Sequence, residues 1–341
     1  MRDSPLIHQS RLYARDAFEI GRFVWRPAPG ARRSSAIGSQ PLMVIPRHPV
    51  RIRQHGARGA RGDGAGGFIA DPRSAVFYNA GQRYDAEQLV GEGEDSIFFA
   101  LPASIVLDVV RESARSSRSK WLRNEPIDDP DRPIPFTHGP CDARSFELQQ
   151  RLVRYLQCCD VDGLAVEETT VELSARLLRL AFAAAPEAEP LDPPTPADRR
   201  RRDSAEAARL VLLRHFREPL SLGEVAQQVG LSSHHLCRVF RAHVGQSMHQ
   251  YRLDLRLRAS LEPLCDAKVS LAALALDLGF NSQSHFTTAF CRRFGCTPAR
   301  FRRDGHDPRA FVSSMRCAFA GRSRRIPEGV VGVLPAPPAG A

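Results

Sequence analysis

The chain has no long apolar run. None of its segments approaches the roughly 18 continuous apolar residues of a membrane-spanning helix, so we expect no membrane span. Its eight cysteines include no Cys-x-x-Cys pair, and no segment resembles a signal peptide. This combination is typical of reduced thiols in the cytoplasm. The adjacent Cys158 and Cys159 have two interpretations, as sensors of oxidants or electrophiles or as core residues of a helix.

Clustered metal ligands are also lacking. The first half of the chain has few histidines, and they are widely scattered: His8, His48, His55 and His138. A non-haem metal site needs about three ligands that converge on one ion. The pattern argues against a metalloenzyme, and we expect no metal, no cofactor and no enzymatic activity.

What the chain does contain is a tandem repeat. The two copies occupy residues 221–245 and 270–295, and the second follows at an offset of 49 residues up to a central glycine and 50 residues after it. Each copy fits a helix-turn-helix. Two such units in tandem predict a protein that reads two adjacent DNA grooves.

The first copy has the signals of two helices joined by a tight turn. Leu222, Val225 and Val229 fall at positions i, i+3 and i+7, which places them on one face of a short helix. Gly230 suits the left-handed backbone at its end, and Ser232 is a good cap for the next helix. That helix has an apolar face of Leu236, Val239 and Phe240 and an outward side of Ser233, His234, Cys237, Arg238 and Arg241. A polar and basic outward side can enter a major groove.

The second copy repeats this arrangement. Leu271, Leu274 and Leu278 precede the turn at Gly279, and Asn281 is the expected cap. The inward residues of the following helix are Phe286, Ala289 and Phe290, and the outward ones are Ser282, Gln283, Ser284, Thr287, Thr288, Arg292 and Arg293. Two core-forming helical hairpins without nucleic acid are the alternative. Charge favours DNA, because residues 198–325 carry 23 Lys and Arg against 11 Asp and Glu, a net charge of +12, in a chain of net charge +10.

Residues from about 204 to 303 resemble the DNA-binding domain of AraC/XylS-type transcriptional regulators. The second copy carries the family signature in Ala275, Gly279, Phe280, Ser282, Ser284, Phe286, Phe290, Phe294, Gly295, Thr297, Pro298 and Arg302. The resemblance implies seven helices that form two helix-turn-helix subdomains joined by a longer helix. It also implies that both recognition helices enter successive major-groove segments on one face of promoter DNA.

The resemblance assigns roles to individual side chains. The base-facing positions fall on His234, Cys237 and Arg238 in the first recognition helix and on Gln283, Ser284, Thr287 and Thr288 in the second. Arg238 suits guanine and Gln283 suits adenine, although Arg238 has a phosphate or an intramolecular carboxylate as alternative partners. Arg241, Arg252, Arg292 and Arg293 are the expected phosphate contacts. A short hydroxyl at Thr288 predicts weaker base recognition by the second unit, or contacts to thymine methyl groups.

The sequence also predicts where the helices around these units begin and end. The first helix is expected over Ser204 to Phe216, and the joining helix starts after the cap Ser247 and reaches Glu262. Pro263 should end or kink the joining helix, which leaves the relative angle of the two subdomains open.

The first 185 residues form a separate region. Strands are expected at Pro41 to Val44, Val50 to Arg53, Gly67 to Ile69, Ala75 to Asn79 and Ser96 to Leu101. Two helical stripes follow, Leu148, Leu152, Tyr155 and Leu156, then Leu173, Leu177, Leu180 and Ala184. A small β-barrel with a helical pair resembles the cupin-like sensory domain of such regulators, in which the barrel holds a small effector and the helices form a homodimer seam. The fold class is therefore a two-domain α+β chain: a barrel with two helices, then an all-α double helix-turn-helix.

The domain plan follows from these parts. Residues 1–185 are the sensory and dimerisation domain, 186–203 a stiff linker rich in proline and charge, 204–305 the DNA-binding domain, and 321–341 a disordered tail. Residues 55–67 are expected to form a mobile loop. We expect a cytoplasmic, sequence-specific activator that responds to a small molecule and, as the resemblance implies, contacts RNA polymerase. The alternatives are a protein-interaction module at the N-terminus and a repressor that needs no effector.

Overall fold

A computed structural model of the chain describes residues 6–28, 30–56, 67–89, 93–116, 129–157, 161–185 and 195–304. Cys158 and Cys159, most of the expected loop at 55–67, residues 186–194 of the expected linker and the tail from 321 to 341 lie outside these ranges. In the described ranges, no helix combines the length and apolar character that crossing a membrane requires.

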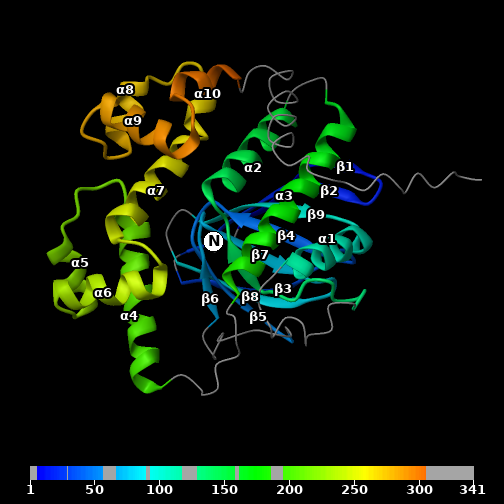
Figure 1. The fold of residues 1–341 in the computed structure, drawn as a ribbon, viewed down its shortest axis with the longest axis horizontal. Helices are drawn as coiled ribbons and strands as arrows, with labels where there is room; N and C mark the ends of the chain where they lie inside the picture. Colours follow the sequence, from blue (N-terminus) through cyan, green and yellow to red (C-terminus); the bar gives the residue numbers. More distant parts are fainter. Residues whose placement is uncertain are drawn as a thin grey trace, which may run out of the picture.

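The N-terminal region contains two antiparallel sheets (Figure 1). The first has six strands in the order β1 (Leu6–Arg15), β2 (Phe18–Arg26), β9 (Glu94–Ala100), β4 (Leu42–Pro46), β7 (Ser74–Tyr78) and β10 (His138–Pro140). The second has four strands in the order β3 (Arg32–Ala36), β8 (Arg83–Gln88), β5 (Val50–Gln54) and β6 (Phe68–Ala70). The five strands expected from the sequence are present as β4, β5, β6, β7 and β9. The α+β architecture is thus confirmed, but the described strands form two sheets and not a closed barrel.

The inner strands β4, β7 and β9 of the six-stranded sheet are buried on both faces, whereas the edge strand β1 is mostly exposed. One face packs on the four-stranded sheet through residues such as Trp25, Ile52 and Tyr78. The other face, which includes Phe77 and Phe99, packs on helices α1 (Ala103–Ser116), α2 (Ala143–Tyr155) and α3 (Gly163–Ala184). Every residue of β9 is buried for this reason. Figure 1 shows the three helices on one side of the sheets.

The expected helical stripes lie on α2 and α3. On α2, Leu148, Leu152 and Tyr155 are buried. On α3, Leu173 and Leu177 are buried, whereas Leu180 is half-buried and Ala184 is exposed. The core-facing side of α3 continues through Ala181 and Phe182, and the last two residues of the helix are exposed.

The C-terminal region is helical, as the resemblance implies. Its helices are α4 (Pro196–His215), α5 (Leu222–Val229), α6 (Ser233–Val244), α7 (Met248–Ser260), α8 (Leu271–Asp277), α9 (Gln283–Phe294) and α10 (Pro298–Asp304). Helix α7 joins the α5–α6 unit to the α8–α9 unit (Figure 1). It ends at Ser260, and Pro263 opens a short 3-10 turn. The helix thus ends two residues before the expected Glu262, and of the two outcomes expected at Pro263, an end or a kink, the structure has the end.

Helix α4 corrects the expected linker. The helix starts at Pro196 and not at Ser204, so residues 196–203 are helical. Thr195 and Asp198 form a reciprocal capping box, and Pro196 occupies the first turn, where its missing N–H costs nothing. The proline and charge that indicated an exposed linker are instead the start signal of a 20-residue helix.

Candidate nucleic-acid interface

The first helix-turn-helix has the turn expected from its sequence. Gly230 ends α5 with a φ of 71°, and the Ser232 hydroxyl accepts a hydrogen bond from the His235 N–H at the start of α6. Val225 is buried on α5. Leu222 is a correction, because its side chain is 41% exposed and does not join the core face. Its position in the first residue of α5 places it at the rim of the unit.

Helix α6 turns one face inward and the other to solvent. Leu236, Val239 and Phe240 are buried. His234, Cys237, Arg238 and Arg241 are exposed, and Ser233 is half-buried. The Arg238 Nη2 donates to Nδ1 of His235 at 3.2 Å. All three proposed base-facing side chains of the first unit are therefore accessible, and Arg238 has no carboxylate partner among the described residues.

The second helix-turn-helix repeats the geometry with one difference. Gly279 has a φ of 80°. The cap of α9 is Ser282, whose hydroxyl accepts from the His285 N–H, and not Asn281 as expected. The cap position lies one residue later because the second unit has an inserted residue after its turn.

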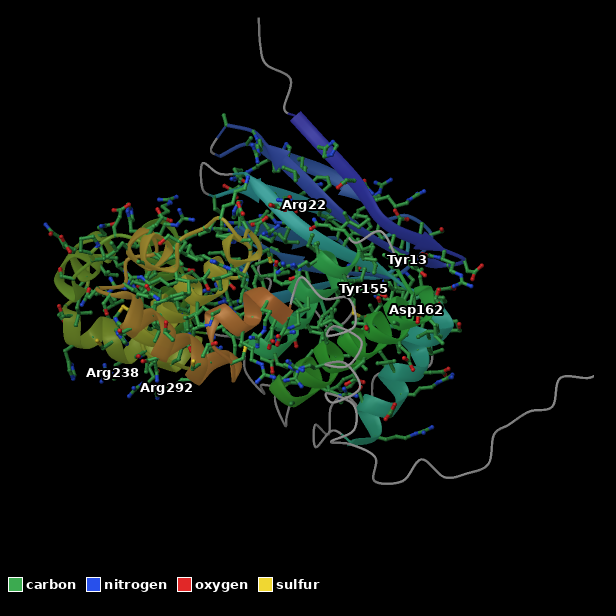
Figure 2. All side chains as sticks on the ribbon, turned by 90° about the horizontal axis from the view of Figure 1, so that it is seen from above. Tyr13, Arg22, Tyr155, Asp162, Arg238 and Arg292 are labelled. Atoms are coloured by element: carbon green, nitrogen blue, oxygen red, sulfur yellow. The ribbon has the colours of Figure 1, made fainter. Side chains whose placement is uncertain are left out.

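The outward side of α9 is mostly exposed. Phe286 and Phe290 are buried, whereas Ala289 is half-buried. Of the proposed base-facing residues, Gln283, Ser284 and Thr288 are exposed and Thr287 is half-buried. Figure 2 shows Arg238 of α6 and Arg292 of α9 at the same outer edge of the helical region, on the side turned away from the sheets. The two recognition helices thus offer their polar residues on one accessible side.

The four expected phosphate contacts fall into two groups. Arg241 and Arg292 are exposed. Arg252 is half-buried and donates to the Leu220 carbonyl at 3.0 Å. Arg293 forms an ion pair with Asp254 at 2.6 Å. Arg241 and Arg292 are therefore accessible to DNA in this structure, whereas Arg252 and Arg293 have intramolecular partners.

Arg256 is a residue of the joining helix that sequence reasoning missed. Its guanidinium donates to the carbonyl oxygens of Phe216 at 2.5 Å and Gly279 at 2.6 Å, and more weakly to those of Arg217 and Glu218. These carbonyls belong to the end of α4 and to the turn of the second unit. Burial and the neighbouring Arg252 lower the pKa of Arg256 to about 10, so it stays charged at neutral pH. One side chain therefore connects the two units through hydrogen bonds. Its partners are distant in sequence, so no local sequence pattern predicts this role.

A second candidate site lies between the two sheets. A cavity of about 590 Å³ is lined by Phe23, Tyr84 and Phe98 among others. Arg33 also lines it, in contact with the rings of Phe23, Trp25 and Tyr84 at 4.5, 5.2 and 5.1 Å.

The Arg33 side chain has both polar partners and an unmet donor. Its Nη2 forms an ion pair with the buried Glu94 at 2.8 Å, and its Nη1 donates to the Tyr84 hydroxyl at 2.8 Å. Its buried Nε has no hydrogen-bond partner among the described residues. An aromatic enclosure with one charged pair at its base is typical of a small-molecule site.

Known proteins resemble part of this chain. A helix-turn-helix domain family matches residues 225–304. The HTH-type transcriptional regulator ArgR of Pseudomonas aeruginosa is 34% identical over 105 residues, which are 31% of this chain and 32% of that protein. The probable transcription factor PqrA of Proteus vulgaris is 34% identical over 91 residues, 27% of this chain and 75% of that protein. The chain thus spans about a third of ArgR and three quarters of PqrA.

A solved structure resembles part of the chain. The crystal structure of an AraC-type regulator from Chromobacterium violaceum matches with a TM-score of 0.29 and 29% identity, over 31% of this chain and 95% of that one.

Proposed function

This chain belongs to the AraC/XylS-type family of transcriptional regulators, and from that premise we propose that it is a sequence-specific regulator that reads two adjacent major-groove segments of promoter DNA. The observation that carries the proposal is the pair of capped recognition helices with exposed polar faces on one side of the molecule. The 13-residue joining helix is about 20 Å long at 1.5 Å per residue. In this proposal, the helix and the flanking subdomains together bridge the roughly 34 Å that separate successive major-groove segments.

Each unit has its own base-reading residues in this proposal. Arg238 binds guanine O6 and N7, with His234 and Cys237 beside it on α6. Gln283 binds adenine, and Ser284, Thr287 and Thr288 contact neighbouring bases from α9. Arg241 and Arg292 hold phosphates on either side, and Arg252 and Arg293 join them after they leave their intramolecular partners. A protein that works on promoter DNA in this way is cytoplasmic in a bacterium.

Selection of bound sequences from a random DNA pool by the full-length protein tests the proposal. The expected result is a site of two blocks whose centres lie about one helical turn apart. A variant with Arg238→Ala should relax base preference at one position of the block read by α6 and leave the other block unchanged, and Gln283→Ala should relax one position of the block read by α9. Failure to enrich any sequence would favour the alternative of a protein-interaction function.

The N-terminal region is proposed to sense a small molecule. The support is the cavity between the sheets, whose volume of about 590 Å³ suits a metabolite, and the presence in its lining of Arg33, whose guanidinium pairs with the buried Glu94. Binding there would regulate an activator that contacts RNA polymerase and forms a homodimer through α2 and α3. There are two alternatives to this proposal. The N-terminal region is a module that binds another protein, or the whole protein is a repressor that needs no effector.

Trp25 offers a direct test for an effector, because it is buried beside Arg33. A Trp121→Phe background leaves Trp25 as the single tryptophan of the chain. A metabolite that occupies the cavity should change Trp25 fluorescence saturably, and Arg33→Gln should abolish the change. Arg51→Gln is the control, because Arg51 lies on β5, outside the cavity lining, and pairs with Glu87. Transcription from the selected site with purified RNA polymerase then separates an activator from a repressor.

A further inference from the structure

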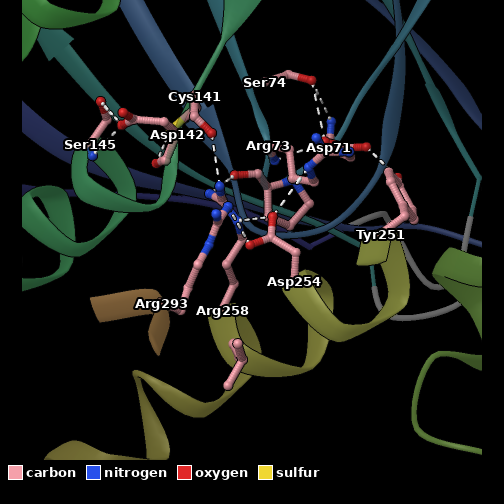
Figure 3. A network of polar contacts seen from close by, with 12 residues as sticks. Asp71, Arg73, Ser74, Cys141, Asp142, Ser145, Tyr251, Asp254, Arg258 and Arg293 are labelled. Atoms are coloured by element: carbon pink, nitrogen blue, oxygen red, sulfur yellow. Dashed lines mark hydrogen bonds and ion pairs between the residues drawn. The ribbon is translucent and has the colours of Figure 1, made fainter. Parts of the chain in front are cut away.

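Asp254 lies where three parts of the chain meet. It is a buried residue of α7 with three guanidinium groups around its carboxylate (Figure 3). Arg258 Nε lies 3.0 Å from Oδ2, Arg73 Nε lies 3.2 Å from Oδ2, and Arg293 Nη2 lies 2.6 Å from Oδ1. Arg73 comes from the turn between β6 and β7, and Arg293 from the last turn of recognition helix α9. One carboxylate therefore touches both the N-terminal sheets and the candidate DNA interface.

The three arginines are not held equally. Arg258 is 2% exposed and also donates to the carbonyl oxygens of Pro72 and Cys141, so it is fixed in place. Arg73 is 23% exposed and Arg293 is 41% exposed. Although Arg293 is close to Oδ1, this oxygen accepts no aligned hydrogen bond among the described residues. Arg293 is thus the partner that leaves Asp254 most easily.

The net charge of this cluster favours the separation of Arg293 from Asp254. Two carboxylates, Asp71 and Asp254, are surrounded by four guanidinium groups, those of Arg73, Arg209, Arg258 and Arg293. If Arg293 moves away, Asp254 retains two cationic partners and no buried carboxylate is left alone. A DNA phosphate offers Arg293 an equivalent partner at the surface.

We propose that Asp254 is a positioning residue shared by Arg73 and Arg293, through which the N-terminal sheets set the availability of Arg293 for a DNA phosphate. The inference rests on the proposed DNA-binding function. Arg73 and Arg293 pair with different oxygens of Asp254 at the same time. While Arg73 is paired, it offsets part of the carboxylate charge and repels the Arg293 guanidinium, so the Arg293 ion pair is weaker and Arg293 transfers more readily to a DNA phosphate. When Arg73 is withdrawn, Asp254 holds Arg293 more firmly and DNA binding weakens.

The position of Arg73 connects the Arg73–Asp254–Arg293 contacts to the cavity between the sheets. Arg73 directly precedes β7, and Tyr78 at the other end of this strand lines the cavity. A ligand that shifts β7 by a fraction of an ångström would change the distance between Arg73 and Asp254. A movement of the sheets would therefore change the strength of the Asp254–Arg293 ion pair at α9.

The first experiment needs no DNA. Phenylglyoxal modifies accessible guanidinium groups, and peptide mapping of the full-length protein gives the rate at Arg293. Arg73→Gln should slow this rate by about threefold or more. Without Arg73, only Arg258 and Arg293 share the Asp254 carboxylate, so the Arg293 ion pair is stronger and its guanidinium is less accessible. Arg73→Lys should restore most of the rate, since it restores the charge. Arg51→Gln, which removes a half-buried arginine paired with Glu87 at 3.5 Å, should leave the rate unchanged.

The second experiment measures DNA affinity at several salt concentrations by fluorescence anisotropy. Arg73→Gln should weaken binding about threefold to tenfold and flatten the slope of log K against log salt by about 0.9, the contribution of one phosphate contact. In an Arg293→Gln background the same change should have no effect. A purely structural role of Arg73 would instead lower affinity equally in both backgrounds.

The two experiments separate the possible failures. An unchanged Arg293 modification rate in Arg73→Gln overturns the shared carboxylate, whatever the DNA results. A loss of affinity in Arg73→Gln that persists with Arg293→Gln also overturns it. If the modification rates change as expected but the wild-type protein binds no DNA, the proposed function fails while the shared carboxylate stands.

Discussion

At the scale of single residues, Gly230 and Gly279 occupy equivalent turns in different surroundings. Both have positive φ values, 71° and 80°. A Cβ on Gly230 would meet open space, whereas one on Gly279 would lie 2.2 Å from the Arg217 carbonyl oxygen and 2.6 Å from Arg256 Nη2. The second turn needs glycine for close approach as well as for its backbone conformation.

This difference predicts unequal costs for the same substitution. Gly230→Ala should lower the free energy of unfolding by about 1 kcal/mol, the cost of a left-handed alanine. Gly279→Ala should lower it by about 3 kcal/mol, because the clash with Arg217 and Arg256 is added. Urea unfolding of the two variants measures both values. Equal losses would mean that the neighbours of Gly279 move aside freely.

Arg238 and Arg292 are predicted to differ in what they recognise. Arg238→Ala should weaken binding to the selected site by about 1 to 3 kcal/mol and relax base preference at one position. Arg292→Ala should weaken binding to all DNA alike and flatten its salt dependence. Anisotropy titrations with the selected duplex and a scrambled duplex make the comparison. Equal losses on both duplexes for Arg238→Ala would contradict its role as a base reader.

At the scale of elements, the joining helix α7 carries the contact that sets the geometry of the two units. Arg256→Met removes a donor shared by carbonyls of α4 and of the second turn, so the units should lose their fixed relation. The wild-type protein should lose most of its affinity for a site with one base pair inserted between the blocks, and the variant should tolerate the insertion. Arg252→Met is the control for spacing on the same helix. Because Arg252 is a proposed phosphate contact, this change should lower affinity for both sites alike. It should keep the spacing preference, because Arg252 donates to a carbonyl of the first unit alone. A retained spacing preference in Arg256→Met would show that packing, not this side chain, fixes the units.

Elements defined by local signals could be predicted from the sequence. The turn glycines, the caps Ser232 and Ser247 and the buried Phe240 and Phe290 all act within a few residues of one another. The cap of α9 was predicted one residue early because Asn281 and Ser282 are both good caps. The start of α4 was missed because its capping box lies inside a segment whose proline and charge also suit a linker.

At the scale of the whole molecule, the features that the sequence did not predict depend on long-range contacts. Strands β1 and β2 pair along almost their whole length, yet their mixed polar pattern gives no clear alternation. Whether strands close a barrel depends on which edges meet, and no short segment contains this information. Arg73 and Asp254 are far apart in sequence, so only the folded chain brings them together. The same is true of Asp71, which pairs with Arg209 and Tyr251.

Asp71 makes the packing of the two regions sensitive to acid. It is 1% exposed and accepts from Arg209 and from the Tyr251 hydroxyl. Burial alone would raise its pKa, but Arg209, Arg73 and the Tyr251 hydroxyl bring the pKa down from 3.8 to about 2. Because the folded pKa is the lower one, the ionised Asp71 stabilises the folded chain above about pH 4. That contribution should disappear as the pH falls from about 4 to 2, at a cost of about 2 kcal/mol.

Urea unfolding of the full chain between pH 5 and pH 2 measures this loss. Asp71→Asn should be less stable than the wild type at pH 5, where the carboxylate is ionised, and should lose less stability on acidification because the titrating group is gone. The two stability curves are therefore expected to converge toward pH 2. Asp277→Asn, which removes an exposed carboxylate 3.7 Å from Arg217, should follow the wild-type curve throughout. Parallel curves for Asp71→Asn and the wild type would mean that the buried Asp71 is not the group whose protonation loosens the two regions.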